Sequence, residues 1–226
     1  MRSVRYLLAA ALVSGVPGTA MAQTSPSSNP VPALAPANDA GVVQSHWTAS
    51  GFVGSNFGAS TDAPLIDNHS SFDVGGEVAY LWKGLVGAEF LTDFAPSFNI
   101  GNALIPDGPH LSSYMANAIG AIPIGPRGQF QPFVSGGYGG IQMRSNVATG
   151  TGATATTDSA SEITWGANVG GGIMAFAGKV GFRADLRYYR AATNNNLSGT
   201  ASDQLTQTLL SGLSFWRTGV GVAFQW

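Results

Sequence analysis

The chain has 226 residues, of which 44% are hydrophobic and only 10% are charged, whereas about a quarter of the residues in an ordinary soluble domain are charged. With so few charged side chains, only a small part of the protein surface can be ionic. The formal net charge of −2 argues against nucleic-acid binding, and the absence of cysteine excludes disulfide bonds, thiolate metal sites and lipidated cysteines.

Residues 1–22 have the pattern of a secretory signal peptide. Basic residues precede an apolar run at 6–16, which is too short to cross a bilayer comfortably, and AMA at 20–22 is a small-residue cleavage pattern. An uncleaved membrane anchor is the less favoured alternative, because the apolar run is short. We therefore expect the mature chain to begin at Gln23. Residues 23–45 are rich in proline, serine and alanine and have no hydrophobic period, so we expect a disordered lead-in.

The remaining residues, 46–226, alternate between large apolar side chains and small or polar ones. Four stretches alternate clearly at period two, the period of a strand with two unlike faces. They are residues 72–80, 86–94, 179–189 and 217–226. Four weaker stretches are also compatible with strands, at residues 46–58, 111–122, 129–143 and 163–174. Eight is an even number, as antiparallel barrels of bacterial membranes require.

The connections between these strands alternate in length. Three are short and contain turn residues, at 82–84, 123–128 and 177–179. Four are long and rich in small and polar residues, at 59–70, 95–110, 145–162 and 191–208. Outer-membrane barrels have short periplasmic turns and longer extracellular loops. The sequence therefore predicts an all-β fold, an eight-stranded antiparallel transmembrane β-barrel over residues 46–226.

The two faces of the predicted strands differ in a way that fixes which face is outside. Charged residues share a face with glycines, and the opposite face carries large apolar residues. A soluble lipocalin-like barrel has the reverse arrangement. We predict a lipid-facing set consisting of Phe182, Leu186, Val220, Val222 and Phe224. Aromatic residues near the strand ends are typical of interfacial girdles.

Eight charged residues fall on the predicted inward faces and form the predicted lumen cluster. They are Asp73, Glu77, Glu89, Asp93, Arg183, Asp185, Arg187 and Arg217. A tight turn centred on Lys83 places Glu77 opposite Glu89 and Asp73 opposite Asp93. Like charges in such positions repel unless cations neutralise them.

We predict that Arg183 bridges Glu77 and Glu89, and that the other five charged residues form an adjoining layer. A guanidinium group can satisfy two carboxylates at once. The favoured interpretation is a packed polar plug, since the interior of an eight-stranded barrel is just filled by side chains. A narrow, gated ion path is the alternative.

Three stretches carry a family resemblance: FQPFVSGGYGG at 130–140, GFRADLRYYR at 181–190 and the terminal GVGVAFQW. Over about residues 46–226 the chain resembles small outer-membrane β-barrel proteins of the opacity and OmpA-like porin superfamily. The resemblance implies a bacterial outer-membrane location and allows a small pore. Members usually end on phenylalanine, whereas Trp226 ends this chain, so Phe224 and Trp226 are the expected C-terminal assembly signal.

The three histidines, His46, His69 and His110, lie at a strand start or in and beside long loops. A few eight-stranded barrels are lipid-modifying enzymes with histidine and serine at the outer leaflet, but the sequence has no extended motif of that kind. We interpret the histidines as solvated and predict no catalytic residue. A metal site at His69 with Asp62 or Asp67 is equally weak, because loop spacing fixes no geometry. No metal and no cofactor are predicted.

The expected function is therefore a non-enzymatic barrel with an envelope-structural role or a surface-interaction role through its long loops. The expected partners are outer-membrane lipids and lipopolysaccharide, the barrel-assembly machinery and an extracellular surface of unknown chemistry. A small gated pore is the first alternative, and a lipid-modifying enzyme is the second.

Overall fold

The computed structural model describes residues 44–61, 70–98, 109–125, 127–149, 156–193 and 199–226. The predicted signal peptide, and the predicted lead-in up to residue 43, lie outside these residues. Among the helices in the described part of the chain, none is long and apolar enough to span a bilayer.

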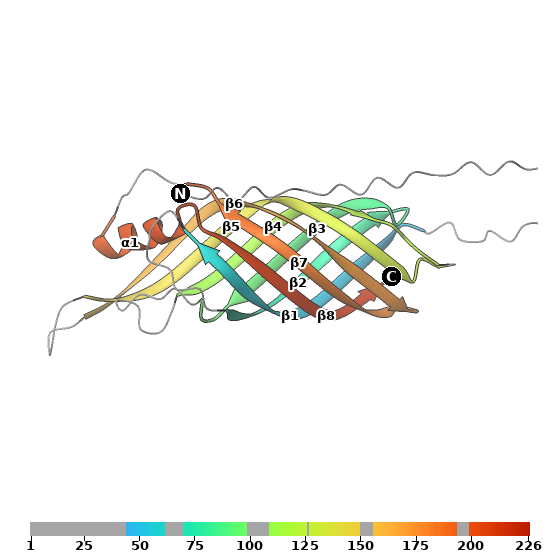
Figure 1. The fold of residues 1–226 in the computed structure, drawn as a ribbon, viewed down its shortest axis with the longest axis horizontal. Helices are drawn as coiled ribbons and strands as arrows, with labels where there is room; N and C mark the ends of the chain where they lie inside the picture. Colours follow the sequence, from blue (N-terminus) through green and yellow to red (C-terminus); the bar gives the residue numbers. More distant parts are fainter. Residues whose placement is uncertain (1–43, 62–69, 99–108, 126, 150–155, 194–198) are drawn as a thin grey trace, which may run out of the picture. The chain divides into compact units, whose positions relative to one another are not determined.

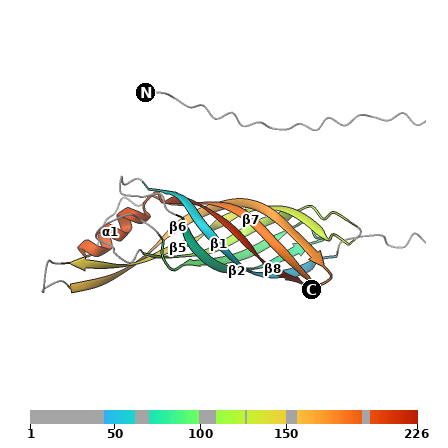
Figure 2. The same cartoon turned by 60° about the horizontal axis from the view of Figure 1, so that its bottom comes forward.

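The described residues form one closed barrel of antiparallel strands (Figures 1 and 2). The strands are β1 (His46–Ser60), β2 (Ser71–Trp82), β3 (Val86–Ala95), β4 (His110–Ala121), β5 (Phe130–Thr149), β6 (Thr156–Ala177), β7 (Val180–Ala191) and β8 (Ser214–Gln225). Each strand pairs with its neighbour in the chain, and β8 pairs with β1. At this closing seam the backbone groups of Trp47 and Trp226 exchange hydrogen bonds of 2.9 and 3.1 Å. The predicted fold class is confirmed.

The register of β2 and β3 differs from the predicted one. Ala79 lies opposite Glu89 and Gly75 lies opposite Asp93, so the predicted pairs of Glu77 with Glu89 and of Asp73 with Asp93 are wrong by two positions. The turn is centred on Gly84 rather than on Lys83, and both residues have positive φ, 66° and 52°. A two-residue shift leaves every side chain on its predicted face, because strand side chains alternate with period two.

The hairpin of β5 and β6 is longer than predicted. These strands have 20 and 22 residues, whereas the other six have between 10 and 15. Pairing continues from Arg144 and Ser161 to Thr149 and Thr156, so residues 145–162 are not simply a long loop. The Thr- and Ser-rich sequence of this stretch is compatible with strands, because threonine fits a pleated surface well.

Helix α1 (Ala201–Leu210) lies in a stretch that the sequence assigns to a loop. It begins with a capping box in which the backbone N–H of Thr200 donates to Asp203 at 2.8 Å and the N–H of Asp203 donates back to Thr200 Oγ1 at 3.4 Å. The hydrogen bond from the Thr200 backbone holds the pKa of the Asp203 carboxyl below its ordinary value. The helix lies along the extended ends of β5 and β6 (Figures 1 and 2).

Apolar side chains fill both ends of the barrel interior. The loop-end cluster lies at the end of the barrel that carries the long connections. It combines inward side chains of the strands with side chains from the segments just outside the strands. It includes Leu91, Phe98, Leu111, Ile141, Leu209, Leu210, Leu213 and Phe215. The turn-end cluster consists of Leu81, Ile119, Ala121, Phe133, Met174, Phe176 and Ala223. The charged residues of β2, β3, β7 and β8 occupy the middle of the interior, between the two clusters.

Candidate functional site in the barrel lumen

The eight residues of the predicted lumen cluster all lie inside the barrel. Their exposed fractions are between 0% and 8%, and three arginines are among the most deeply buried large side chains. Burial of so many charges is unfavourable unless they pair with one another and make further hydrogen bonds. The lumen cluster is therefore the candidate functional site of the barrel.

Arg183 is the centre of the network. Its guanidinium contacts Glu77 through Nη1, lies 2.7 Å from Glu89 Oε2 through Nη2, and lies 3.2 Å from Asp185 Oδ2 through Nε. The guanidinium carbon also lies 4.0 Å from the centre of the Phe133 ring. The planar group thus connects β2, β3 and β7 and packs against the turn-end cluster.

The other two arginines extend the network toward the loop end. Arg187 Nη2 lies 2.8 Å from Glu89 Oε1, so Glu89 receives two guanidinium groups. Arg217 Nη2 lies 2.8 Å from Asp185 Oδ1, and its Nη1 lies 3.2 Å from Asp93 Oδ2. Asp185 thereby lies between positive groups of β7 and β8. Arg187 and Arg217 are direct cross-strand neighbours, and these carboxylates compensate their repulsion.

Asp73 differs from the other carboxylates of the cluster. It shares the enclosed space with the adjoining layer, as its inward position on β2 requires. Neither of its oxygens has a hydrogen-bond partner, and no ion pair joins it to an arginine within the described residues. Asp73 therefore lies in the layer that the sequence predicts for it and interacts electrostatically with Arg217, but it makes no direct contact with an arginine of the described residues.

Neutral polar side chains complete the network and were missed in the sequence. Four of them donate hydrogen bonds of 2.7–2.9 Å to its carboxylates, namely Ser50 to Glu77, Asn117 to Glu89, and Ser113 and Tyr189 to Asp93. Each is on the inward face of its strand. The alternation of β1 and β4 is weak because small residues occupy both faces, so hydrophobic periodicity alone did not single out Ser50, Ser113 and Asn117. Tyr189 is on the clearly alternating strand β7, but it carries no charge that would mark it as part of the network.

The outer wall of the barrel is apolar. The five residues of the predicted lipid-facing set point away from the lumen, with exposed fractions between 42% and 58%. Trp216, near the start of β8, and Trp226, which directly follows the end of β8, are also exposed on the outside. Ten strand residues rise about 34 Å, which is about 25 Å in height at a tilt near 45°. That height matches the apolar band of an outer-membrane barrel, about 25 Å tall and flanked by aromatic residues.

Neither a scan against protein-family models nor a search of curated proteins finds a match for the chain. Among solved structures, Neisserial surface protein A is similar with a TM-score of 0.53 and 13% identity, over 79% of this chain and 96% of that one. The attachment invasion locus protein Ail of Yersinia pestis has a TM-score of 0.49 and 13% identity, over 81% and 99% of the two chains. The fold is that of a small outer-membrane β-barrel. At this identity the likeness concerns the fold alone.

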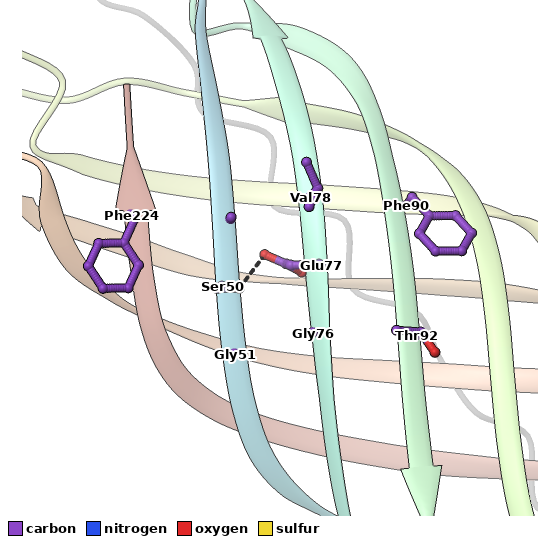
Figure 3. A pocket seen from close by; sticks show the side chains of 9 residues that line it. Ser50, Gly51, Gly76, Glu77, Val78, Phe90, Thr92 and Phe224 are labelled. Carbon is purple, nitrogen blue, oxygen red and sulfur yellow. Dashed lines mark hydrogen bonds between the residues drawn. The ribbon is translucent and has the colours of Figure 1, made fainter.

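A hollow in the outer wall of this outer-membrane barrel fold has a volume of about 490 Å³ (Figure 3). Its floor includes Gly51 and Gly76, which are cross-strand neighbours, and Val78, Phe90 and Phe224 stand around it. An added side chain at Gly51 would meet no atom within 4 Å. The hollow arises from missing side chains on an apolar surface. Ser50 and Glu77 also line it, but both are buried, and the Ser50 hydroxyl donates to Glu77 at 2.7 Å.

The described histidines, His46 and His110, form no hydrogen bond, ion pair or ring contact with the lumen cluster. His46 Nδ1 lies 3.0 Å from the backbone oxygen of Gln44, and His110 stacks on Phe94 with ring centres 6.0 Å apart. His69, with the metal site considered for it, lies outside the described residues. Within the described ranges, no group of three or more His, Cys, Asp and Glu side chains is arranged to hold a metal ion.

Proposed function

We propose that this protein is a closed, non-enzymatic barrel of the bacterial outer membrane that supports the cell envelope and presents its loop end to surface partners. The observation that carries the proposal is the lumen: guanidinium groups that are at most 1% exposed join four strands across the interior. Apolar clusters lie on both sides of this ionic layer. Such an interior favours a rigid plug over a water-filled path.

An outer-membrane location is supported by the distribution of side chains. Large apolar residues cover the outside, and charged residues fill the inside, which is the arrangement expected in lipid. The outer leaflet would then contribute lipopolysaccharide as a neighbour of the wall. Phe224 and Trp226, which lie on the outer face beside the closing seam, are the residues we propose for recognition by the barrel-assembly machinery.

The surface-interaction part of the proposal rests on the β5–β6 hairpin and α1. Side chains join the helix to the hairpin: Ser145 and Thr206 hydroxyls are 2.8 Å apart, and Gln207 donates to Glu162 at 3.0 Å. Leu209 belongs to the loop-end cluster, so the helix is also tied to the barrel interior. A helix and a hairpin held in this way form an ordered platform beyond the wall of the barrel.

A conductance measurement tests the closed lumen. The full mature protein, reconstituted in planar bilayers, is expected to give no discrete current steps, because the ionic layer and the apolar clusters leave no continuous polar path. Arg190→Ala, which alters an exposed arginine on β7, should be equally silent. Reproducible steps in the unaltered protein would instead establish the small pore.

Single cysteines test the location and the orientation, since the natural chain has none. Gln204→Cys places a thiol on the exposed side of α1, and Lys179→Cys places one in the exposed turn between β6 and β7. A membrane-impermeant maleimide should label intact cells only at residue 204, and disrupted cells at both residues. Labelling of residue 179 alone in intact cells would show the opposite orientation.

A further inference from the structure

The outer wall of the barrel carries positive charge at its loop end. Among the outward strand side chains that the structure describes, the charged ones are Arg144 of β5 and Arg190 of β7, and both are exposed. The described strand carboxylates lie on the opposite face, because five are buried in the lumen and Glu162 accepts a hydrogen bond from Gln207 of α1. The chain therefore supplies no described counter-charge on this wall.

Arg144 lies between two exposed hydrogen-bond donors. Its direct cross-strand neighbours are His110 of β4 and Ser161 of β6. Such neighbours have Cβ atoms about 4.5–5.5 Å apart, so the three side chains can reach one ligand. The His110 ring is held by stacking on Phe94, and no described carboxylate forms an ion pair with Arg144. We call His110, Arg144 and Ser161 the outer patch.

Below the outer patch the wall changes from polar to aromatic in two steps. Gln142, two residues nearer the middle of β5, donates to Ser161 at 3.1 Å. Two residues further, Tyr114 and Trp165 lie on either side of β5, and Trp165 stacks on Tyr138 with ring centres 5.7 Å apart. Each step is about 6.8 Å along the strand, or about 5 Å in height at a tilt near 45°. Aromatic belts lie at the membrane interface, and the headgroup layer beyond it is roughly 5–8 Å thick. The outer patch is therefore at headgroup level.

We propose that the outer patch binds the phosphate group of an outer-leaflet lipid, an inference that rests on the outer-membrane location proposed above. A guanidinium group forms paired, charge-assisted hydrogen bonds with phosphate oxygens. The imidazole of His110 and the hydroxyl of Ser161 donate to the remaining oxygens. The aromatic and apolar wall below receives the acyl chains of the same molecule, so a lipid occupies both parts, whereas free phosphate would occupy only the upper one.

Arg190 provides a matched comparison on the same wall. It is also exposed at the loop end, but its cross-strand neighbours are Ala167 and Ser214. It thus has the charge of Arg144 with neither the imidazole nor the polar row beneath. The proposed site depends on the arrangement of neighbours, and an exposed arginine alone does not form it.

The test uses the full mature protein folded in dodecyl maltoside, an uncharged detergent. Dioctanoyl phosphatidic acid, or dioctanoylglycerol with the same chains and no phosphate, is added, and the bound lipid is counted by native mass spectrometry. The unaltered protein should retain one phosphatidic acid at a concentration about tenfold lower than it needs for the glycerol lipid, because hydrogen bonds to charged groups are strong. Arg144→Gln should abolish this preference, His110→Leu should reduce it about threefold, and Arg190→Gln should retain it.

Equal retention of the two lipids by the unaltered protein would overturn the proposal, whether or not the variants fold. A preference that survives in Arg144→Gln, or that is lost in Arg190→Gln, would overturn it as well. Inorganic phosphate at the concentration of the phosphatidic acid should displace none of it. Displacement at equal concentration would identify a site for free phosphate and would overturn the assignment to a lipid.

The labelling experiment separates this proposal from the proposed location. Labelling of residue 204 in intact cells, combined with equal retention of the two lipids, would overturn the outer patch and leave the location standing. Labelling of residue 179 alone would overturn the proposed orientation, and with it the outer leaflet as the source of the lipid.

Discussion

Replacing Arg183 with alanine is expected to lower the free energy of unfolding by about 3–5 kcal/mol, the usual loss when one partner of a buried ion pair is removed. The arginine contacts three carboxylates, and within the described residues no other guanidinium forms an ion pair with Glu77. Glu89 retains Arg187, and Asp185 retains Arg217. The variant therefore leaves one carboxylate buried without a counter-charge, and weakens two others.

Urea unfolding of the protein in lipid vesicles measures this loss. Arg190→Ala is the matched control, because Arg190 is on the same strand but is exposed, and its removal should change stability by no more than about 0.5 kcal/mol. Glu77→Gln in the Arg183→Ala background should restore part of the stability, since it removes the orphaned charge. Equal effects of the two alanine variants, or no restoration by Glu77→Gln, would contradict the ionic account of the lumen.

An arginine at Val220 is expected to destabilise the barrel by about 2–4 kcal/mol, the cost of a basic side chain at the bilayer midplane. Val220 is 58% exposed on the outer wall and lies between Trp216 and Trp226 on β8, near the middle of the apolar band. The arginine would lie among acyl chains. Its cross-strand neighbours are Val53 and Ala184, so neither offers a carboxylate to pair with it.

Val180→Arg is the control for depth, because it is the same change at the turn end of the neighbouring strand, where the cost should be about 0–1 kcal/mol. Val180 is also exposed, at 48%, so the two variants differ mainly in height along the wall. Unfolding in vesicles again provides the measurement. If the two substitutions cost the same, or if Val220→Arg is harmless, the outer wall does not face lipid as proposed.

The alternation of apolar and polar residues was sufficient to predict the barrel. A period of two assigns each side chain of a strand to one of its two faces, and this assignment does not depend on which strand lies beside it. Arg183 and Val220 could therefore be assigned to opposite faces before any pairing was known. The pairing itself was less predictable. The dihedral angles of Lys83 and Gly84 decide where the turn is centred, and a sequence with glycine there is compatible with either register.

Two features at the loop end were not predictable from hydrophobic patterns. The extra length of β5 and β6 consists of small and polar residues that pair through their backbones, so no apolar period marks it. Helix α1 is held by its cap at Thr200 and by contacts with the hairpin, while its own apolar residues are few. Backbone pairing decides the hairpin, whereas in α1 the contacts with the hairpin act together with the local capping box.

The partners of the ionic layer are far apart in the chain. Glu89 pairs with arginines 94 and 98 residues later, and Asp93 with one 124 residues later. A barrel that contains β2 and β3 but still lacks β7 and β8 would thus expose unpaired carboxylates at bilayer depth. A truncated or wrongly closed barrel is destabilised by these unpaired buried charges, whereas the fully closed barrel is not. The ion-pair network therefore favours correct closure late in assembly.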